Sequence, residues 1–386
     1  MEKMKKKYRI LIVMRWPIGG IRTFSKYVYS NFDESLFSFT LVAPDVEEVW
    51  LLAEALKSYE IRLITTKYKG EVAYISPWAL LKVLLFETYD LIHSHGLSTG
   101  SLVSIPAKIL GRPHIMTLHE VITKHQVSGI KGWCRRAIFH ITMPFIQKLH
   151  HVSHDAKCSV LEHVPLLKRF PGKHIVIPNG VEIRDFSTTE RRDYREDLQL
   201  PKNSFLIGFI GRFMKAKGFK YLIEAIEIMD AKDELPRLPV IICLGWGGFI
   251  REEQEVIRKK DLTRYFRFLP FTPNVGAFLK GVDVLAIPSV WEAFCLAAAE
   301  ALVAGVPIIG TNCIGLREVL LHTPARVVPP QNSPALAEAL LLEMKQSSQS
   351  KALSYIHTAR ERFDVRKQAK QLQNIILQMI HEYGKK

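Results

Sequence analysis

Residues 283–318 read DVLAIPSVWEAFCLAAAEALVAGVPIIGTNCIGLRE, and this stretch decides the fold. The apolar run 284–287 ends at Pro288, which is typical of a buried strand followed by a turn. An alanine-rich segment, 295–304, predicts a helix that Gly305 ends. The apolar run 307–310 predicts a second strand, so the stretch reads as strand, helix and strand.

The same alternation of apolar strands and helical patterns extends along the whole chain of 386 residues. It favours an α/β fold with parallel sheets. We expect strands in the first half at 9–14, 39–42, 62–65, 91–94, 114–118, 149–153 and 175–177, and in the second half at 206–210, 240–244, 266–269, 284–287, 308–310 and 326–328. Between the two sets, segment 184–203 is charged and poor in large apolar residues, which indicates a linker. We therefore predict two Rossmann-like domains facing a cleft.

Two carboxylates, Glu292 and Glu300, stand eight residues apart across the start of the predicted helix. On a helix this spacing spans roughly 12 Å along the axis and roughly 80° around it, so one elongated ligand can touch both. The free N–H groups near Phe294, Cys295 and Leu296 would face an anion lying between the carboxylates. A sugar, a diphosphate and a ribose in series fit this arrangement. A surface helix with two solvated glutamates fits the same spacing.

Two basic residues, Arg212 and Lys217, follow the first strand of the second half. An Arg side chain offers a fork of donors to phosphate oxygens, and a Lys side chain offers a point charge. The pair therefore suits a diphosphate. Because exposed basic residues are common on any surface, the prediction depends on the position of this loop before the Glu292 segment.

Three candidate residues in the first half also follow predicted strands, where ligands of open α/β sheets bind. Gly19 and Gly20 come after the first strand and allow a phosphate to approach the backbone closely, although a plain turn is an alternative. His119 comes after the fifth strand and can donate or accept a proton, although a structural histidine is an alternative. His93 and His95, after the fourth strand, are rival candidates.

These motifs resemble those of retaining glycosyltransferase family 4, also described as glycosyl transferases group 1, which has the GT-B fold. Residues 292–300 are similar to its Glu-x7-Glu signature, and residues 211–218 are similar to its Gly-Arg-x4-Lys-Gly element. The chain departs from the family pattern at Cys295, where Gly is usual, and at 314–318, where a Gly pair is usual.

The resemblance implies a role for each candidate residue. Glu292 would contact hydroxyls of the donor sugar, and Glu300 would contact the nucleotide ribose. Arg212 and Lys217 would neutralise the departing diphosphate. The Gly19-Gly20 loop would contact the donor phosphate region, and His119 would lie near the donor sugar.

The resemblance also implies the organisation of the whole chain and its reaction. Residues 1–183 would bind the acceptor, and residues 184–366 would bind the donor. The amphipathic helix at about 367–386 would return to the first domain. We expect retaining transfer from a nucleotide-diphosphate sugar, such as a UDP- or GDP-sugar, to a glycan, lipid-linked or small-molecule acceptor in cell-surface polysaccharide or glycolipid synthesis. No cofactor and no metal ion are expected, because the sequence has no Asp-x-Asp motif.

The net charge is +15, and it is unevenly distributed. Residues 108–173 contain eleven Lys and Arg against three Asp and Glu. Such a stripe attracts acidic partners, namely anionic lipid, acidic glycan, nucleotide or nucleic acid, and a basic surface without a partner is the alternative. For the basic and aromatic segment 129–151 we hypothesise reversible contact with an anionic membrane. Packing as an ordinary Rossmann helix is the alternative for that segment.

The expected location follows from the apolar runs and the cysteines. No stretch of about 18 residues is free of charge, so no membrane span is predicted. The apolar run 10–14 is too short for the core of a signal peptide. The five cysteines form no close pair, which favours a reducing compartment. We expect a cytoplasmic protein with peripheral contact at the inner face of the membrane.

Two other functions were compared with glycosyl transfer. A nicotinamide oxidoreductase could use Asp45 to bind a ribose, but Gly19 and Gly20 lack the remaining Gly-x-Gly-x-x-Gly spacing. A nucleic-acid-binding protein could use the basic stripe. However, the sequence shows no aromatic RNA platform or helix-turn-helix signature, and that function leaves the two glutamates unused. We therefore expect no nucleic-acid partner.

Overall fold

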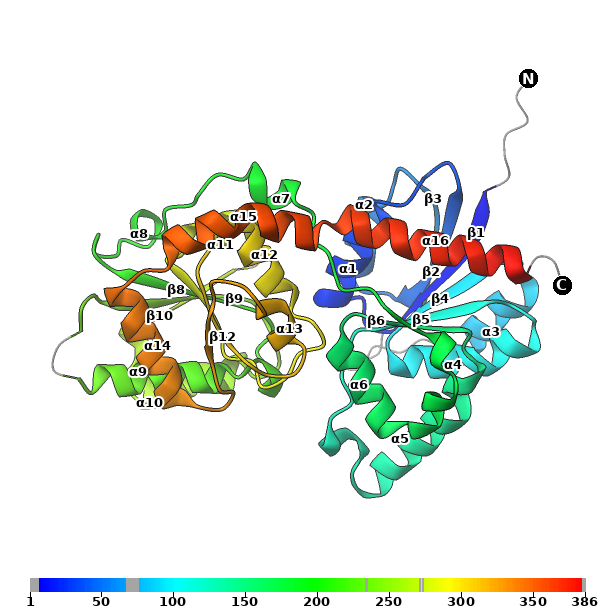
Figure 1. Cartoon of the computed structure of the whole chain (residues 1–386), viewed down its shortest axis with the longest axis horizontal. Helices are drawn as coiled ribbons and strands as arrows, with labels where there is room; N and C mark the ends of the chain where they lie inside the picture. The colour runs from blue at the N-terminus through cyan, green and yellow to red at the C-terminus, as the bar shows by residue number, and fades with distance from the viewer. Residues whose placement is uncertain (1–6, 67–75, 233–234, 271, 273, 384–386) are drawn as a thin grey trace. The chain divides into compact units, whose positions relative to one another are not determined.

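The computed structural model describes residues 7–66, 76–232, 235–270, 272 and 274–383. The chain forms two compact units, one of Met1–Gly180 with Val365–Lys386 and one of Val181–Asp364 (Figure 1). The first unit was predicted to end at residue 183, and in the structure it ends at Gly180. The helix that returns to this unit was predicted to begin at about residue 367, and in the structure it begins at Val365.

The first unit is built on a seven-stranded parallel sheet in the order β3-β2-β1-β4-β5-β6-β7. Its strands are β1 (Tyr8–Met14), β2 (Phe37–Pro44), β3 (Glu60–Thr66), β4 (Leu91–His95), β5 (His114–Leu118), β6 (Lys148–His151) and β7 (His174–Val176). All seven predicted strands are present, with ends shifted by at most two residues. This confirms the Rossmann-like fold predicted for the first half.

Helices cover both faces of this sheet (Figure 1). One face carries α1 (Gly20–Tyr29), α2 (Glu47–Ala55) and α16 (Val365–Tyr383), and the other carries α3 (Pro77–Phe86), α4 (Leu97–Ile109), α5 (Gly129–Thr142) and α6 (His154–His163). Helix α16 buries Leu372 and Ile376 completely, and Gln368 accepts a 2.7 Å hydrogen bond from the N–H of Gly180. The C-terminal segment therefore completes the first unit. Over the described residues, every helix is too short or too polar to cross a bilayer.

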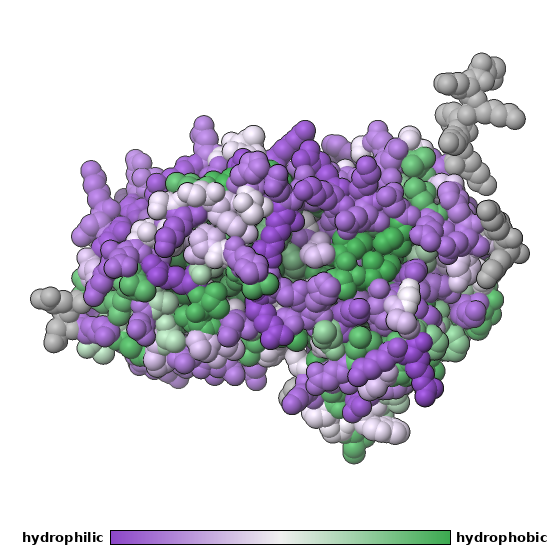
Figure 2. All heavy atoms as spheres, in the orientation of Figure 1, coloured by the Kyte–Doolittle hydropathy of each residue, from purple (hydrophilic) through white to green (hydrophobic). Residues whose placement is uncertain are grey.

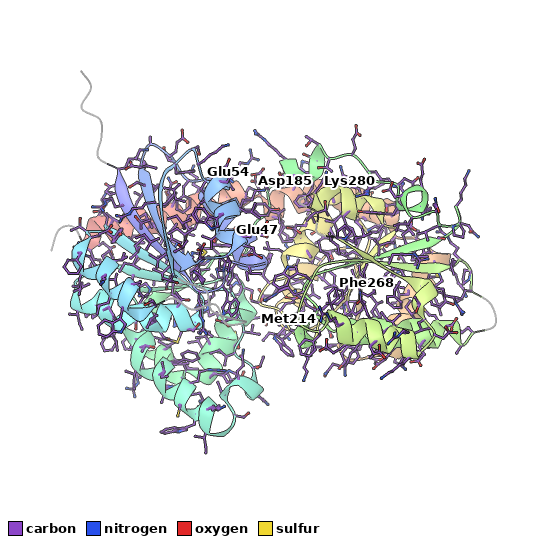
Figure 3. All side chains as sticks on the ribbon, turned by 180° about the vertical axis from the view of Figure 1, so that it is seen from behind. Glu47, Glu54, Asp185, Met214, Phe268 and Lys280 are labelled. Carbon is purple, nitrogen blue, oxygen red and sulfur yellow. The ribbon has the colours of Figure 1, made fainter. Side chains whose placement is uncertain are left out.

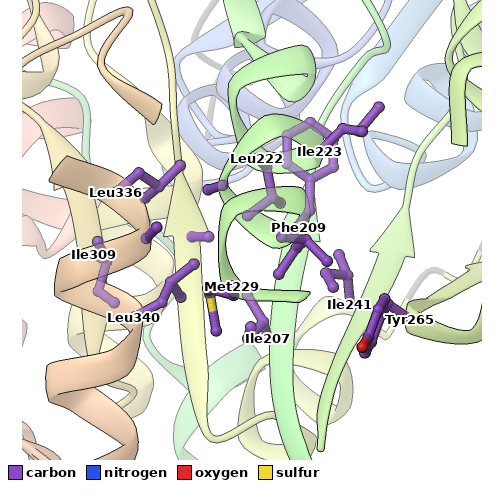
Figure 4. Packing of buried hydrophobic residues seen from close by; sticks show 14 of the residues in the cluster. Ile207, Phe209, Leu222, Ile223, Met229, Ile241, Tyr265, Ile309, Leu336 and Leu340 are labelled. Atoms are coloured by element: carbon purple, nitrogen blue, oxygen red, sulfur yellow. The ribbon is translucent and has the colours of Figure 1, made fainter. Parts of the chain in front are cut away.

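The second unit is built on a six-stranded parallel sheet in the order β10-β9-β8-β11-β12-β13. Its strands are β8 (Phe205–Ile210), β9 (Pro239–Leu244), β10 (Phe266–Leu269), β11 (Val284–Ile287), β12 (Ile308–Thr311) and β13 (Arg326–Val328). One face carries α9 (Phe219–Asp230), α10 (Ile250–Lys259) and α14 (Ser333–Lys345), and the other carries α11 (Val275–Gly281), α12 (Leu296–Ala304) and α15 (Gln349–Phe363). Ile207 and Phe209 of β8 pack with Leu222 of α9 and Leu336 of α14 in a dry core (Figure 4).

One prediction about the second unit was wrong. Segment 184–203 is not a linker, because it forms α7 (Arg184–Ser187) and α8 (Tyr194–Asp197) and buries Phe186 and Tyr194. Figure 3 shows Asp185 of α7 near Lys280 of α11, whose Nζ donates a 2.6 Å hydrogen bond to the carbonyl of Thr189. Within the segment, Arg192 and Asp197 form an ion pair, so charges of this segment bond locally instead of marking a linker.

Asn332 caps α14, because its side chain accepts a hydrogen bond from the N–H of Ala335, at 3.0 Å. Ser333 is the first residue of the helix, and its hydroxyl donates to Glu224. Asn and Ser are equally good caps, and the sequence places them side by side, so spacing alone does not separate them.

Candidate active site

The strand order of the second sheet reverses between β8 and β11, which are paired neighbours. The loop after β8, residues 211–218, carries Arg212 and Lys217. The loop after β11, residues 288–295, carries Glu292. In open α/β sheets, ligands bind at the carboxyl ends of strands where the order reverses. Both motifs chosen from the sequence therefore lie at the position in this unit that best suits a ligand.

An ion pair joins the two loops. Nζ of Lys217 lies 2.7 Å from Oε1 of Glu292, and the hydroxyl of Ser289 donates a 2.8 Å hydrogen bond to the same oxygen. The side chains of Lys217 and Glu292 are 24% and 11% exposed, so both remain accessible at the surface of the unit. The structure thus brings together a cation and a carboxylate that lie 75 residues apart in the sequence.

Two glycines allow these loops to approach each other. Gly218 has a φ of +65°, and a Cβ atom there would lie 2.0 Å from the carbonyl oxygen of Pro288. Gly315, after β12, has a φ of +79°, and its Cβ atom would lie 2.3 Å from the carbonyl oxygen of Glu292. Only glycine fits both the backbone conformation and the space at these positions. The glycines therefore set where Lys217 and Glu292 can lie.

The electrostatics of the site keep Lys217 charged. Burial disfavours the charged form, but the attraction of Glu292 and its hydrogen bond outweigh this effect, so the pKa of Lys217 is raised. Arg212 is more exposed. Desolvation lowers the pKa of Arg212, and the negative charge of Glu292 partly opposes that shift. Arg212 and Lys217 give the loop after β8 a net positive charge.

The start of α12 differs from the expectation. We expected helical spacing between Glu292 and Glu300, and this was wrong because α12 begins only at Leu296. Cys295 before it has a left-handed backbone, with φ 78° and ψ 80°. Glycine, which is usual at this position in the family that the sequence resembles, adopts this conformation without strain. Because Cys295 is not helical, helical spacing does not relate the two glutamates.

The remaining candidates of this segment are placed differently from one another. Glu300 lies in the second turn of α12 and is 6% exposed. The ring of Phe294 packs edge-on against Phe363 at 6.3 Å, so only its backbone is available to a ligand. The N–H group of Leu296 lies in the first helical turn, where no earlier carbonyl of the helix can accept it. The predicted anion site at this helix start therefore depends on backbone groups.

Gly19 and Gly20 lie in the first unit. Gly19 precedes α1 with φ 58° and ψ −129°, and Gly20 is the first residue of that helix. The pair thus forms the turn between β1 and α1, the position at which Rossmann-like domains bind phosphate. In the same sheet the strand order reverses between β1 and β4.

His119 also lies in the first unit, directly after β5. Its Nε2 lies 2.9 Å from Nδ1 of His95, and its ring packs edge-on against Phe24 at 4.7 Å. Burial lowers the pKa of His119 to about 3, so the ring is neutral at physiological pH. The rival candidates His93 and His95 are buried strand residues behind His119. The structure links the three histidines instead of making them alternatives.

Sequence reasoning missed Ser289, which is 1% exposed and holds Glu292 in place. The carbonyl of Ser289 accepts a 2.6 Å hydrogen bond from the hydroxyl of Thr311 on the next strand. A serine directly after a strand and three residues before a candidate carboxylate is a signal that can be searched for. The described residues contain no group of three or more His, Cys, Asp or Glu arranged to hold a metal ion.

Comparison with known proteins gives a match in each half of the chain. The model of the family described as Glycosyl transferases group 1 matches residues 190–362. The model of the family described as Glycosyltransferase Family 4 matches residues 18–185. The two matched ranges lie almost entirely within different structural units and together span most of the chain.

Curated relatives match part of the chain. The UDP-Gal:alpha-D-GlcNAc-diphosphoundecaprenol alpha-1,3-galactosyltransferase of Escherichia coli is 29% identical over 61% of this chain and 62% of its own length. A D-inositol 3-phosphate glycosyltransferase of Corynebacterium jeikeium is 34% identical over 59% of this chain and 57% of its own length. The chain thus spans about three fifths of the length of these relatives.

A solved structure matches nearly the whole chain. Anabaena Alr3699/HepE, crystallised with UDP and glucose, has a TM-score of 0.79 and 20% identity, covering 96% of this chain and 100% of its own. This likeness confirms the two-domain α/β fold predicted from the sequence.

Proposed function

Because the chain belongs to the family 4 glycosyltransferases, which have the GT-B fold, we propose that it transfers a sugar from a nucleotide-diphosphate sugar to an acceptor hydroxyl. The observation that carries this proposal is the cluster formed by the Lys217–Glu292 ion pair, with Arg212 in the same loop as Lys217, where the strand order reverses in the second unit. The nicotinamide and nucleic-acid alternatives give this cluster no role. The proposed reaction gives each member one.

The roles follow from charge and hydrogen-bonding capacity. Glu292 is an acceptor and suits the hydroxyls of the donor sugar, and buried Glu300 suits the ribose. Lys217 has three N–H donors, of which Glu292 takes one, so two remain for phosphate oxygens. Arg212 adds a fork of donors on the same loop. Fixed positive charge at the point where negative charge develops is an effective way to stabilise a departing diphosphate.

We infer that the transfer retains the anomeric configuration by a front-face route. A double displacement needs a nucleophilic carboxylate and a second acid at the reacting carbon, and no such pair was evident in the sequence. In the front-face route the departing diphosphate takes the proton of the acceptor hydroxyl, while Arg212 and Lys217 neutralise it. The proposal needs no metal ion and no cofactor beyond the nucleotide sugar.

The proposed substrates draw on what the similar proteins are named for. The E. coli relative is named for a UDP-sugar and a diphosphoundecaprenol-linked acceptor, and the Anabaena structure contains UDP and glucose. We propose a UDP- or GDP-sugar as donor and a glycan or lipid-linked acceptor in cell-surface polysaccharide or glycolipid synthesis. The Gly19-Gly20 turn and His119 of the first unit would contact the donor as well.

A panel of UDP- and GDP-sugars, tested by thermal shift and by nucleoside diphosphate release in the presence and absence of EDTA, examines this proposal. Lys217→Ala and Glu292→Gln should each lower kcat/KM at least about 100-fold, as loss of a group that stabilises the transition state does. Lys215→Ala is the matched control, because its exposed side chain lies in the same loop two residues away. Wild-type turnover in the Lys217 or Glu292 variant refutes the roles, and a product of inverted configuration refutes the front-face route.

We also propose reversible contact of the first unit with an anionic membrane through α5. Of its apolar side chains, Ile130 is 86% exposed, Trp133 is 69% exposed and Ile141 is 60% exposed. Lys131, Arg135 and Arg136 are exposed on the same helix. Hydrophobic and hydrophilic side chains are interleaved over this part of the surface in Figure 2. This combination suits a bilayer interface, where apolar residues insert and cations meet lipid headgroups.

Neighbouring helices extend this face. Helix α4 packs on both α3 and α5, and these helices expose large apolar side chains at Trp78, Phe86 and Ile109. Sedimentation with phosphatidylglycerol vesicles at low and moderate salt tests the contact. Ile130→Asp with Trp133→Asp should abolish binding, and Leu51→Asp, on α2 across the sheet, should not. Absence of binding at low salt, or equal binding by all variants, refutes the proposal.

A further inference from the structure

Four histidines of the first unit lie close together at the carboxyl ends of three neighbouring strands. His93 and His95 belong to β4, His150 belongs to β6, and His119 follows β5. The parallel register pairs His95 with Thr117 and Thr117 with His150, so these side chains lie on one face of the sheet. Helix α1 covers that face and contributes Tyr29, which is fully buried.

The buried groups form one unbroken chain of hydrogen bonds that begins at His119. In order, the members behind His119 are His95, Tyr29, His93, Thr117 and His150, and we call these five residues the histidine relay. The successive distances are 2.9, 2.8, 2.8, 2.7 and 3.0 Å. The relay ends at the backbone carbonyl of Ile177, which lies 3.0 Å from Nε2 of His150.

The carbonyl of Ile177 sets the direction of the bonds nearest to it. A carbonyl only accepts, so Nε2 of His150 carries a proton and, in the neutral ring, Nδ1 has a lone pair. Nδ1 of His150 then accepts from the hydroxyl of Thr117. The oxygen of Thr117 in turn accepts from Nε2–H of His93, which leaves Nδ1 of His93 as an acceptor.

The bonds between His93 and His119 run in the same direction. Nδ1 of His93 accepts from the hydroxyl of Tyr29, and that oxygen accepts from Nε2–H of His95. Nδ1 of His95 then accepts from Nε2–H of His119. When all four histidines are neutral, the carbonyl of Ile177 thus determines the tautomer of each of them. In His119 the resulting tautomer carries its proton on Nε2 and a lone pair on Nδ1. The structure gives Nδ1 of His119 no hydrogen-bond partner within the described residues.

We propose that the histidine relay is a positioning device that holds His119 as the Nε2–H tautomer, so that its Nδ1 accepts a hydrogen bond from a substrate hydroxyl. The substrate hydroxyl rests on the proposed function, because sugars supply such donors. A fixed lone pair selects a hydroxyl and rejects a carbonyl or phosphate oxygen at this position. Orientation by a second group is the usual means by which proteins set which ring nitrogen of a histidine is free.

The order of hydrogen bonds requires that the histidines of the relay are neutral, and burial and neighbouring charge keep them so. Burial and the neighbouring histidines hold the pKa values of His93 and His95 well below the ordinary value. Burial lowers the pKa of His150 to about 4. A second proton on His95 would also place two N–H donors face to face between His95 and His119. The relay therefore resists the proton uptake that would reverse its bonds.

Tyr29→Phe is the variant that tests the proposal, because it removes only the hydroxyl in the middle of the relay. His93 and His150 remain tied to the carbonyl of Ile177 and should keep their tautomer. His95 and His119 lose that connection and should sample both tautomers. Tyr59→Phe is the matched control, since Tyr59 is a buried tyrosine of the same unit whose hydroxyl bonds to the carbonyl of Phe32 instead.

The first readout is long-range proton–nitrogen NMR of the full chain labelled with nitrogen-15 in histidine. It distinguishes protonated from unprotonated ring nitrogens at pH 7 and needs no activity. The His119 signals are assigned by their loss in a His119→Gln variant. A fixed Nε2–H state in the wild type that is lost at His119 only in Tyr29→Phe supports the relay. A mixed state in the wild type, or a fixed state in Tyr29→Phe, overturns it.

The second readout is kinetic. Tyr29→Phe should lower kcat/KM about two- to tenfold, the range expected when a positioned group loses part of its orientation, and Tyr59→Phe should leave it unchanged. Equal kcat/KM in wild type and Tyr29→Phe overturns the role towards substrate. If no nucleotide sugar is turned over by the wild type, the proposed function fails, and the NMR result still decides whether the relay exists.

Discussion

Lowering the pH from 7 to 5 should destabilise the first unit far more than the second. Five histidines of the first unit are fully or almost fully buried: His93, His95, His114, His150 and His151. Burial lowers the pKa of each, to about 3 at His114 and to about 2 at His151, for example. The two histidines of the second unit, His322 and His357, are both exposed.

The sign and size of the effect follow from proton binding. Below about pH 6.5 the unfolded chain binds protons on these histidines and the folded unit does not. The free energy of unfolding is therefore highest above that pH and decreases as the pH is lowered further. Each neutral buried histidine destabilises the fold by about 2 kcal/mol more at pH 5 than at pH 7. Five amount to about 10 kcal/mol, which is comparable to the whole stability of a typical domain.

Native-state hydrogen exchange read by mass spectrometry measures this effect for each unit separately, after correction for the pH dependence of intrinsic exchange. Peptides from residues 7–180 should lose most of their protection at pH 5, and peptides from residues 181–364 should keep it. In His114→Gln the free energy of unfolding of the first unit should differ between pH 7 and pH 5 by about 2 kcal/mol less than in the wild type. This holds even if the variant is less stable than the wild type at pH 7. Equal losses in the two units, or an unchanged difference in His114→Gln, refute the reasoning.

Substitutions at four positions in the second unit test its local structure by urea unfolding. Gly218→Ala should lose at least about 2 kcal/mol, because its Cβ atom meets the carbonyl of Pro288 at 2.0 Å, and wild-type stability would contradict this. Cys295→Gly should stay within about 1 kcal/mol of wild type, whereas Cys295→Val should lose about 2 kcal/mol or more, because a β-branched residue is strained at a φ of 78°. Arg326→Met should lose about 3–5 kcal/mol, because it leaves the carboxylate of Glu343, 1% exposed, without its ion pair. Adding Glu343→Gln, which removes the charge and keeps an acceptor for the N–H of Ser348, should restore most of the loss.

Much of the fold was predictable because each buried parallel strand is a short apolar run bounded by turn residues. The run 284–287 before Pro288 and the run 206–210 before Gly211 carry this signal clearly, and both form strands. The candidate residues were predictable for a related reason, since loops after parallel strands meet at one edge of the sheet. Lys217 and Glu292 could be paired before any distance between them was known.

What could not be predicted depends on register and on backbone conformation. Ser289 acts on Glu292 through a turn whose shape no sequence spacing describes. The left-handed conformation of Cys295 depends on the neighbouring chain, because cysteine itself does not favour it. The link between His95 and His119 requires the pairing of β4 with β5, and register is not visible in a sequence without an alignment. For that reason the histidines were treated as competitors.

The return of the last helix has a consequence for synthesis on the ribosome. Residues 181–364 are complete as soon as they leave the exit tunnel, but the first unit lacks α16 until residues 365–383 emerge. Until then, the surface that Leu372, Ile376 and Met379 cover stays open to water and to chaperones. The unit encoded first is thus finished last, and a nascent chain truncated after residue 364 would carry a mature C-terminal unit behind an unfinished N-terminal one.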